Sequence, residues 1–275
     1  AMRVLLTNDD GIEAEGLQTL RGALRTLPGI DLVTIAPDGN RSAVGRGITT
    51  RRPLMVERID FDDGDHGYAC DGTPVDCVRL ASLGLAGDDW APDVVVSGIN
   101  HGANLGDDVT YSGTVAAAME GLVLGLPAIA VSQQSLKREM DFRLGLEFAF
   151  EHGARFVARL VAELDAVPLP PSTLLNINVP AGHPEGVEVC RLGKRIYRDR
   201  LEEAPDGREG ERRRYWIYGA DPGFEDEPGT DLAAVHAGRI ALTPLHLDLT
   251  QHDGIGPLSM AELDRLVAPA AEEVE

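Results

Sequence analysis

Short apolar runs alternate along the chain with longer segments in which leucines recur every three or four residues. The first run, Val4 to Leu6, is too short for a helix and predicts a buried strand. The leucines between residues 17 and 27 predict an amphipathic helix, and residues 31–36 form a second apolar run. Strand, helix and strand in this order are typical of a right-handed βαβ unit in a parallel sheet.

The alternation continues to residue 180 and predicts an α/β fold, a mostly parallel sheet flanked by helices. Further strands are predicted at residues 54–59, 67–71, 93–97, 127–132 and 174–179, and further helices at 74–83, 115–122 and 142–164. The first turn carries Asn8-Asp9-Asp10-Gly11 in place of Gly-x-Gly-x-x-Gly, so the dinucleotide-binding fingerprint is absent.

The pattern changes beyond residue 180. Short apparent strands at 186–192, 214–218 and 239–243 alternate with charged and glycine- or proline-rich loops, and a short helix is predicted at 260–267. We therefore expect residues 1–180 to form the α/β catalytic core. Residues 181–275 should form a β-rich extension with a C-terminal tail, for which a contact between subunits is the preferred role.

Composition narrows the classes of partner. The 275 residues carry a net charge of -20, which repels a polymeric nucleic acid but leaves room for a small phosphorylated substrate beside a cation. No apolar run approaches the ~20 residues that cross a membrane. The three cysteines, Cys70, Cys77 and Cys190, have neither metal-type spacing nor an even count. These features predict a cytoplasmic protein without a membrane partner or a disulfide framework.

Two adjacent carboxylates, Asp9 and Asp10, follow the first predicted strand directly. Ligands of open α/β sheets bind outside the carboxyl ends of the strands, so this doublet stands where such a fold carries its chemistry. Neighbouring carboxylates repel each other unless a cation joins them, which favours a divalent metal site. The alternative is that they only cap the next helix, because Asp is common there.

Polar loops follow two other predicted strands and should meet the doublet at the same edge of the sheet. The loop after residue 36 carries Asn40 and Ser42, and the loop after residue 97 carries Asn100, His101 and Asn104. Amide and hydroxyl oxygens are ligands of hard cations, so Asn40, Ser42 and Asn100 can complete a metal site, whereas ordinary turns use the same residues. His101 could serve as an acid or base, although a single loop histidine is more often a surface residue.

Ser112, Gly113 and Thr114 precede an alanine-rich helix. Free backbone N–H groups and the positive end of the helix dipole favour an anion such as phosphate there, although Ser or Thr is also an ordinary N-cap. Carboxylate, amide and hydroxyl oxygens suit Mg²⁺ or Mn²⁺, whereas Zn²⁺ usually takes His or Cys. A hard cation beside a phosphate pocket indicates phosphoryl chemistry.

Several motifs together resemble the stationary-phase survival protein E family of 5'-nucleotidases. They are Leu5 to Gly11, Ala36 to Ser42, Val96 to Gly106, Tyr111 to Gly121, Asn176 to Pro180 and Thr243 to Leu245. The resemblance reaches residue 252. It implies a Rossmann-like sheet with a C-terminal arm used in homodimers or homotetramers.

The resemblance also implies an activity and assigns roles to residues. Family members are metal-dependent phosphatases of nucleoside 5'-monophosphates, and the resemblance extends the candidate substrates to 3'-nucleotides and short polyphosphate. It places one divalent ion on Asp9, Asp10, Ser42 and Asn100 and the phosphate on Asn40, Ser112, Gly113 and Thr114. We further expect Asn104 to contact the substrate and Asp9 and Asp10 to be catalytic, since either could accept the proton of a water molecule. The position of Gly39 departs from the family pattern and leaves the preferred substrate open.

Two other functions fit parts of the pattern. A zinc-dependent amidase or deacetylase can also place an Asp pair after its first strand, but it needs a nearby His ligand, and the first histidine after Asp9 is His66. A non-enzymatic sensor of nucleotides needs the phosphate contacts but no buried pair of carboxylates. The two aspartates therefore favour the phosphatase.

Overall fold

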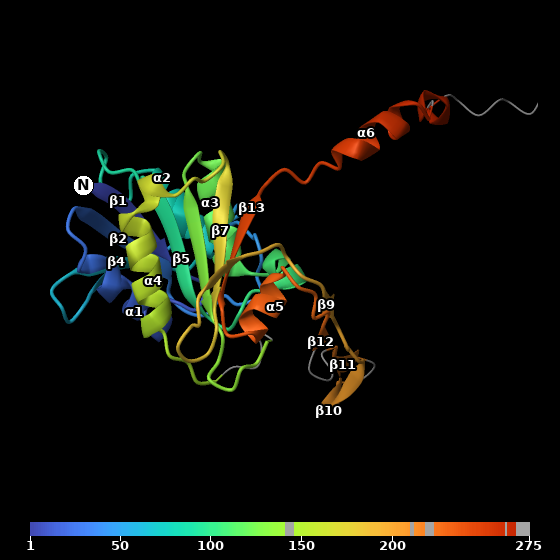
Figure 1. Cartoon of the computed structure of the whole chain (residues 1–275), viewed down its shortest axis with the longest axis horizontal. Helices are drawn as coiled ribbons and strands as arrows, with labels where there is room; N and C mark the ends of the chain where they lie inside the picture. The colour runs from blue at the N-terminus through green and yellow to red at the C-terminus, as the bar shows by residue number, and fades with distance from the viewer. Residues whose placement is uncertain (141–145, 210–211, 218–222, 262, 268–275) are drawn as a thin grey trace, which may run out of the picture.

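A nine-stranded sheet forms the centre of the computed structural model, which describes residues 1–140, 146–209, 212–217, 223–261 and 263–267 (Figure 1). Its strand order is β3-β4-β2-β1-β5-β6-β7-β13-β8. The pairings are parallel except at β3–β4 and β7–β13. The strands are β1 (Met2–Thr7), β2 (Ile30–Pro37), β3 (Val56–Asp60), β4 (His66–Cys70), β5 (Val94–His101), β6 (Ala128–Gln133), β7 (Thr173–Val179), β8 (Val187–Val189) and β13 (Ile240–His246).

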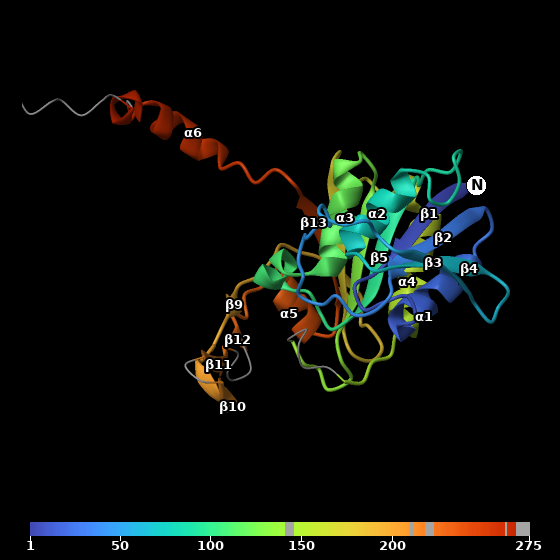
Figure 2. The ribbon, with the colours of Figure 1, turned by 180° about the vertical axis from the view of Figure 1, so that it is seen from behind.

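In the described part of the chain, four helices cover the two faces of this sheet. Helices α1 (Glu15–Arg25) and α4 (Glu151–Ala162) lie on one face, and α2 (Pro74–Ser82) and α3 (Gly113–Val123) lie on the other (Figures 1 and 2). Each face has its own apolar core: Leu17, Leu20 and Leu24 of α1 pack in the first, and Val115 and Ala118 of α3 pack in the second. The predicted α/β fold with a mostly parallel sheet is therefore confirmed. The strands are apolar on both faces because helices bury both sides.

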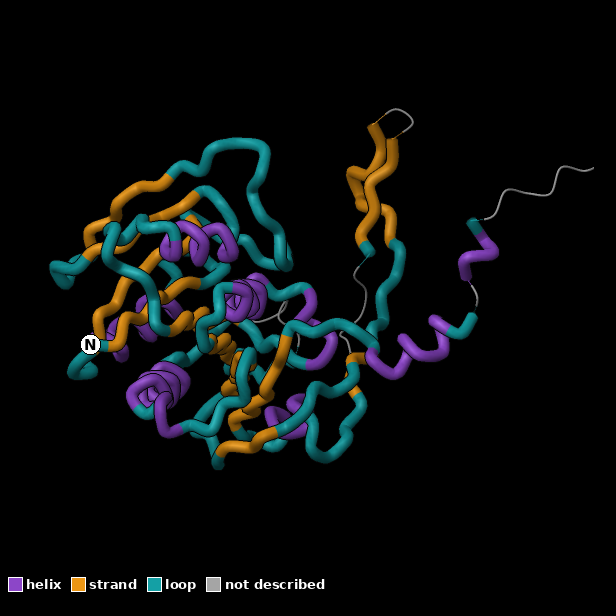
Figure 3. Tube along the Cα trace, turned by 90° about the horizontal axis from the view of Figure 1, so that it is seen from above, coloured by secondary structure: helices purple, strands orange, loops and turns teal. Residues whose placement is uncertain are grey.

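The chain beyond residue 180 adds to the sheet and also leaves it. Strands β8 and β13 join the edge next to β7, and α5 (Asp231–His236) precedes β13. Between them runs a segment that we call the arm, consisting of β9 (Arg195–Ile196), β10 (Glu202–Glu209), β11 (Arg212–Trp216) and β12 (Gly223–Phe224). Figure 3 shows the arm and helix α6 (His252–Ser259) projecting away from the body of the protein. The predicted β-rich arm is present, and both of its ends return to the central sheet.

Two predicted helices differ from the observed ones. Helix α4 begins at Glu151 rather than at 142, and Leu146 is 86% exposed instead of packing in the core. Residues 142–145 of that prediction lie outside the described residues. The backbone N–H of Leu136 donates to the carbonyl of Glu147 (2.8 Å), so this segment pairs with the chain after β6 and does not continue the helix.

The helix predicted at 260–267 was also misplaced. The nearest α-helix is α6, which ends at Ser259, and among the described residues after it there is only a 3₁₀ turn, η3 (Leu263–Leu266). Helix α6 contains Gly254, Gly256 and Pro257. Glycine and proline have the lowest helix propensities, so the sequence does not predict a helix there. No helix among the described residues is long and apolar enough to cross a membrane.

The packing of α1 gives a stability prediction. Leu24 is fully buried against the sheet, so Leu24→Ala should lower the free energy of unfolding by about 2–5 kcal/mol. Leu249 is 93% exposed, so the matched change Leu249→Ala should alter it by less than about 0.5 kcal/mol. Urea titrations of both variants measure the difference, and equal losses would contradict the described core.

Candidate metal and phosphate site

Asp9 and Asp10 lie in a tight turn at the carboxyl end of β1, the fourth strand in the sheet order. The side chain of Asn8 closes the turn: its amide donates to the carbonyl of Gly11 (2.8 Å) and its Oδ1 accepts the N–H of Gly11 (3.2 Å). Gly11 has φ +113°, and a Cβ there would approach Gly39 to 3.1 Å. Glycine is therefore required both by the backbone angle and by the neighbouring loop.

The carboxylates are bound by neutral donors from β5, from α3 and from the loop after β2. The Thr114 hydroxyl donates to Oδ1 of Asp9. The backbone N–H of His101 donates to Oδ2 of Asp10 (3.0 Å), and the Asn40 amide makes a longer contact with Oδ1 of Asp10 (3.4 Å). Each contact orients a carboxylate without neutralising its charge.

Burial strongly disfavours the charged form of both groups. Asp9 is only 3% exposed, and desolvation, with the negative charge of Asp10 as the second cause, raises its pKa to about 7 against the hydrogen bond from Thr114. Desolvation raises the pKa of Asp10 to about 6, while the N–H of His101 opposes the shift. Two desolvated carboxylates side by side attract protons or a cation.

The loop after β2 is fixed against the same turn. The backbone N–H of Arg41 donates to the carbonyl of Asp9 (2.6 Å), and the N–H of Ser42 donates to Oδ1 of Asn40 (2.8 Å). Asn40 thus reaches the doublet directly, whereas Ser42 is exposed and is linked to it through Asn40. Further along the loop, Arg46 forms an ion pair with the buried Glu120 of α3 (3.0 Å), a contact that the sequence analysis did not anticipate.

Helix α3 begins directly beside Asp9. The Ser112 hydroxyl caps the helix by accepting the N–H of Val115 (3.1 Å). A Cβ on Gly113 would lie 2.8 Å from Cβ of Asp9, so only glycine allows the helix to begin this close. The N–H groups of Gly113 and Thr114, in the first turn, have no acceptor within the helix. Two donors and the positive end of the helix dipole therefore adjoin the carboxylates.

The residues after β5 divide into two groups. Asn100 is buried beside the doublet, and its amide donates to the carbonyl of Gly102 (2.8 Å). Asn104 turns toward β6 and β7 instead: its amide donates to the Ser132 hydroxyl (2.8 Å), and Asn178 accepts its N–H (2.8 Å). The predicted substrate contact at Asn104 is thus engaged in holding this loop on the sheet.

His101 is not the surface residue that the sequence analysis favoured. Its Nε2 accepts the N–H of Gly16 at the start of α1 (3.2 Å), and its ring packs on Phe148 and Phe150. Burial lowers its pKa, which favours the neutral ring that this hydrogen bond requires. The chemically relevant part of His101 is its backbone N–H on Asp10. Sequence alone indicates this contact only through the register of β5 and β1.

The kinds of oxygen donor at the site indicate which metal ion it would bind. The described residues contain no group of three or more His, Cys, Asp or Glu side chains arranged to hold a metal. Two carboxylates with neutral oxygen donors nearby match the preference of Mg²⁺ or Mn²⁺ and not that of Zn²⁺. The residues present therefore fit a hard divalent cation. Such an ion would offset the cost of burying the two negative charges, which the raised pKa values reflect.

The fold and the site define an α/β protein with two buried carboxylates, neutral oxygen donors and a helix start gathered at the carboxyl edge of a mostly parallel sheet. The chain belongs to the SurE family, because the model of that family, Survival protein SurE, matches residues 4–199. This confirms the family resemblance of the motifs.

Full-length relatives agree with this membership. A protein of Rubrobacter xylanophilus named 5'-nucleotidase SurE is 51% identical over 97% of this chain and 99% of its own length. A protein of the same name from Gloeobacter violaceus is 44% identical over 98% and 99%. The crystal structure of SurE protein from Aquifex aeolicus superposes with a TM-score of 0.77 at 38% identity, covering 94% of this chain and 98% of that one.

The desolvated doublet predicts an unusual dependence of stability on pH. Unfolded Asp has a pKa near ~3.9, so between that value and about 7 the metal-free folded chain holds protons that the unfolded chain has lost. Its free energy of unfolding should therefore fall as pH rises through this window. Asp9→Asn removes the penalty, so in EDTA the variant should melt above the wild type at pH 8 by at least about 2 °C and show a smaller difference at pH 5.

The control is Asp93→Asn at the exposed ion pair with Arg3. The pKa of Asp93 is lowered by the hydrogen bond from Arg3, so this change should give no gain in melting temperature at pH 8. Calorimetric scans at the two pH values make the comparison. If Asp9→Asn melted at or below the wild type at pH 8, the proposed desolvation of the doublet would be wrong.

Proposed function

We infer that this chain is a 5'-nucleotidase, a divalent-metal-dependent phosphatase that hydrolyses nucleoside 5'-monophosphates to nucleoside and phosphate. The observation that carries the proposal is the direct contact between the two parts of the site: Thr114, at the start of α3, donates its hydroxyl to the buried carboxylate of Asp9. A cation at Asp9 and a phosphate at α3 would therefore share one pocket. The names of the Rubrobacter and Gloeobacter relatives support a nucleotide as substrate.

One Mg²⁺ or Mn²⁺ per subunit would be held by Asp9, Asp10, Ser42 and Asn100. When bound, such an ion polarises a phosphoryl oxygen and lowers the pKa of a water molecule. Asp9 and Asp10 come from the turn after β1, Ser42 from the loop after β2, and Asn100 from β5, three neighbouring strands of the sheet. The burial of the doublet supports this assignment, because an ion would offset the desolvation that raises both pKa values and, at Asp9, the repulsion from Asp10.

Side chains and backbone groups of the chain would position the phosphate and accept the proton of the attacking water. The N–H groups of Gly113 and Thr114 would hold non-bridging oxygens of the phosphate and stabilise the charge of the transition state, with the Asn40 amide, which contacts Asp10, as a further donor. The Ser112 hydroxyl already caps α3, so its role is to fix the direction of these N–H groups. Thr114 orients Asp9, and either Asp9 or Asp10 would accept the proton of the attacking water.

The proposed partners follow from the same features. The net charge of -20 disfavours polymeric nucleic acid, whereas a mononucleotide needs only the local field of the site. We keep 3'-nucleotides and short polyphosphate as further candidate substrates on the family resemblance. The buried free thiols of Cys70, Cys77 and Cys190 support the expected reducing, cytoplasmic location.

A homodimer or homotetramer is proposed from the arm. Leu201, Trp216 and Ile217 on and beside the hairpin β10–β11 are 70%, 62% and 52% exposed. Large apolar side chains gathered on a projecting hairpin favour a contact with a second copy of the chain.

Light scattering after size exclusion tests the oligomer. The wild type should elute as a dimer or tetramer, and Leu201→Ser with Trp216→Ser should shift it toward the monomer because the apolar contact is lost. Leu249→Ser, on the exposed segment after β13, is the matched control and should change nothing. A wild-type chain that is monomeric at high concentration would rule out the contact.

Phosphate release distinguishes the candidate functions. With Mn²⁺ the wild type should release phosphate from AMP, GMP and a chromogenic phosphate ester, and a chelator should stop the reaction. Asp9→Asn should lower turnover by at least about 10³-fold and weaken Mn²⁺ binding, because the carboxylate charge is lost. Activity of Asp9→Asn equal to the wild type would reject this site. Amide hydrolysis without phosphate release would favour the zinc-dependent amidase, and nucleotide binding without turnover would favour the sensor.

A further inference from the structure

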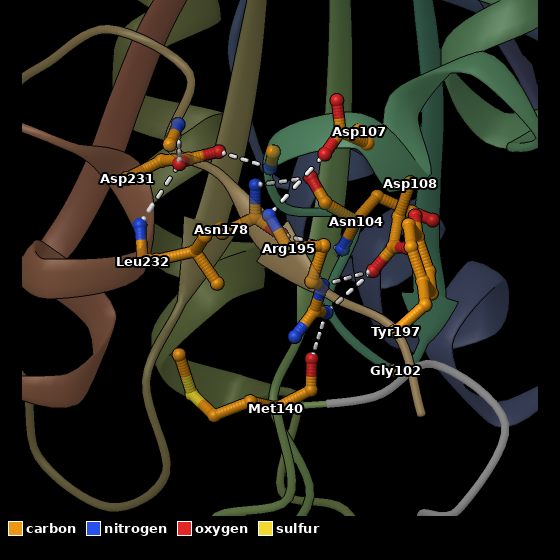
Figure 4. Close-up of polar contacts among 12 residues, drawn as sticks. Gly102, Asn104, Asp107, Asp108, Met140, Asn178, Arg195, Tyr197, Asp231 and Leu232 are labelled. Atoms are coloured by element: carbon orange, nitrogen blue, oxygen red, sulfur yellow. Dashed lines mark hydrogen bonds and ion pairs between the residues drawn. The ribbon is translucent and has the colours of Figure 1, made fainter. Parts of the chain in front are cut away.

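The root of the arm is joined to the short turn that leads into α3. That turn is the 3₁₀ helix η1 (Gly106–Thr110), two residues before Ser112. Arg195 of β9 has a side-chain exposure of 0% and forms an ion pair with Asp108 of η1; its Nε donates to the same carboxylate (2.7 Å). Its guanidinium also donates to the carbonyl of Met140 (Figure 4). A fully buried arginine thus fixes η1 from the side of the arm.

The neighbouring residues of η1 are bound by the same part of the chain. The Tyr197 hydroxyl donates to the other oxygen of Asp108 (2.9 Å), and the backbone N–H of Arg195 donates to Asp107 (3.2 Å). Asp231, at the start of α5, accepts the N–H of Gly106 (2.8 Å). Three consecutive residues of η1 are therefore held by residues beyond 190, although the site itself lies between residues 9 and 114.

Movement of η1 would pass directly to the phosphate donors. The N–H of Tyr111 donates to the carbonyl of Asp108 (3.0 Å), and Ser112 follows as the cap of α3. The helix start has little freedom, because a Cβ on Gly113 would already lie 2.8 Å from Asp9. A misplacement of about 1 Å at such a site can cost 10²-fold in rate.

We propose that Arg195 is a positioning residue: by pairing with Asp108 it fixes η1 and thereby the Gly113 and Thr114 donors of the phosphate site. The inference deepens the proposed function and rests on it. A displacement of the arm would then also displace the start of α3. Loss of the guanidinium removes the ion pair and the donors that tie Asp108 to β9, so η1 is no longer held in place from the side of the arm.

The test replaces Arg195 and follows phosphate affinity as well as turnover. Arg195→Met should raise the Kd for inorganic phosphate, measured by calorimetry with Mn²⁺, and lower kcat/KM for AMP, each by about 10 to 100-fold. Both change because the same donors hold the phosphate of the product and stabilise the transition state. Arg195→Lys keeps the charge but loses the two-pronged contact, so it should fall between Met and wild type.

Arg191→Met is the matched control, because Arg191 pairs with the exposed Glu227 beside the arm and makes no contact with η1. It should leave kcat/KM and phosphate affinity within about twofold. A folded Arg195→Met with wild-type phosphate affinity, whatever its melting temperature, would overturn the inference. If Arg195→Met does not fold, Tyr197→Phe, which removes only the second contact to Asp108, must weaken phosphate binding measurably or the inference fails.

Phosphate binding also separates this inference from the proposed function. A wild type that hydrolyses AMP, with an Arg195→Met variant that binds phosphate normally, would overturn the positioning role alone. A wild type that binds phosphate with Mn²⁺ but does not hydrolyse AMP would overturn the nucleotidase. In that case weaker phosphate binding by Arg195→Met would still support the link from the arm to α3.

Discussion

The constraint on which the structure depends is the burial of two adjacent carboxylates at the end of β1. Asp9 and Asp10 lose hydration without gaining a cationic partner in the described contacts, and their pKa values rise to about 7 and about 6. Their partners are a hydroxyl, an amide and backbone N–H groups, which orient the oxygens but leave the charge in place. Burying such a pair destabilises the metal-free protein, and a bound divalent ion would offset that cost.

The surroundings of the doublet are arranged to keep that charge in position. Asn8 closes the turn, the N–H of Arg41 holds the carbonyl of Asp9, and glycine at 113 lets the helix dipole approach. The protein therefore places a strongly negative and a partly positive element in contact. A phosphate ester that brings its own negative charge can bridge a cation and a helix start, which neither element alone would hold as firmly.

Much of the sheet and of the site could be predicted from local sequence. Buried parallel strands appear as apolar runs, and the carboxyl ends of parallel strands lie at one edge of the sheet. That reasoning was sufficient to place Asp9, Asp10 and Asn40 together. It failed where the outcome depends on distant partners. His101 is buried by Phe148 and Phe150, which are distant in sequence. The late start of α4 has the same origin, a backbone contact between residues 136 and 147. The Asn104 amide contacts Ser132, and its role at the substrate stays a prediction.

The C-terminal part of the chain shows why a boundary at residue 180 is not a boundary in space. The arm is inserted between β8 and β13, and both of these strands lie in the central sheet, so the chain must leave and re-enter beside β7. Its root consequently passes η1, the segment that leads into α3. An inserted arm with two anchored ends transmits displacement to its base more directly than a free tail would. The buried Arg195–Asp108 pair lies at that base and joins the arm to the turn that leads into α3.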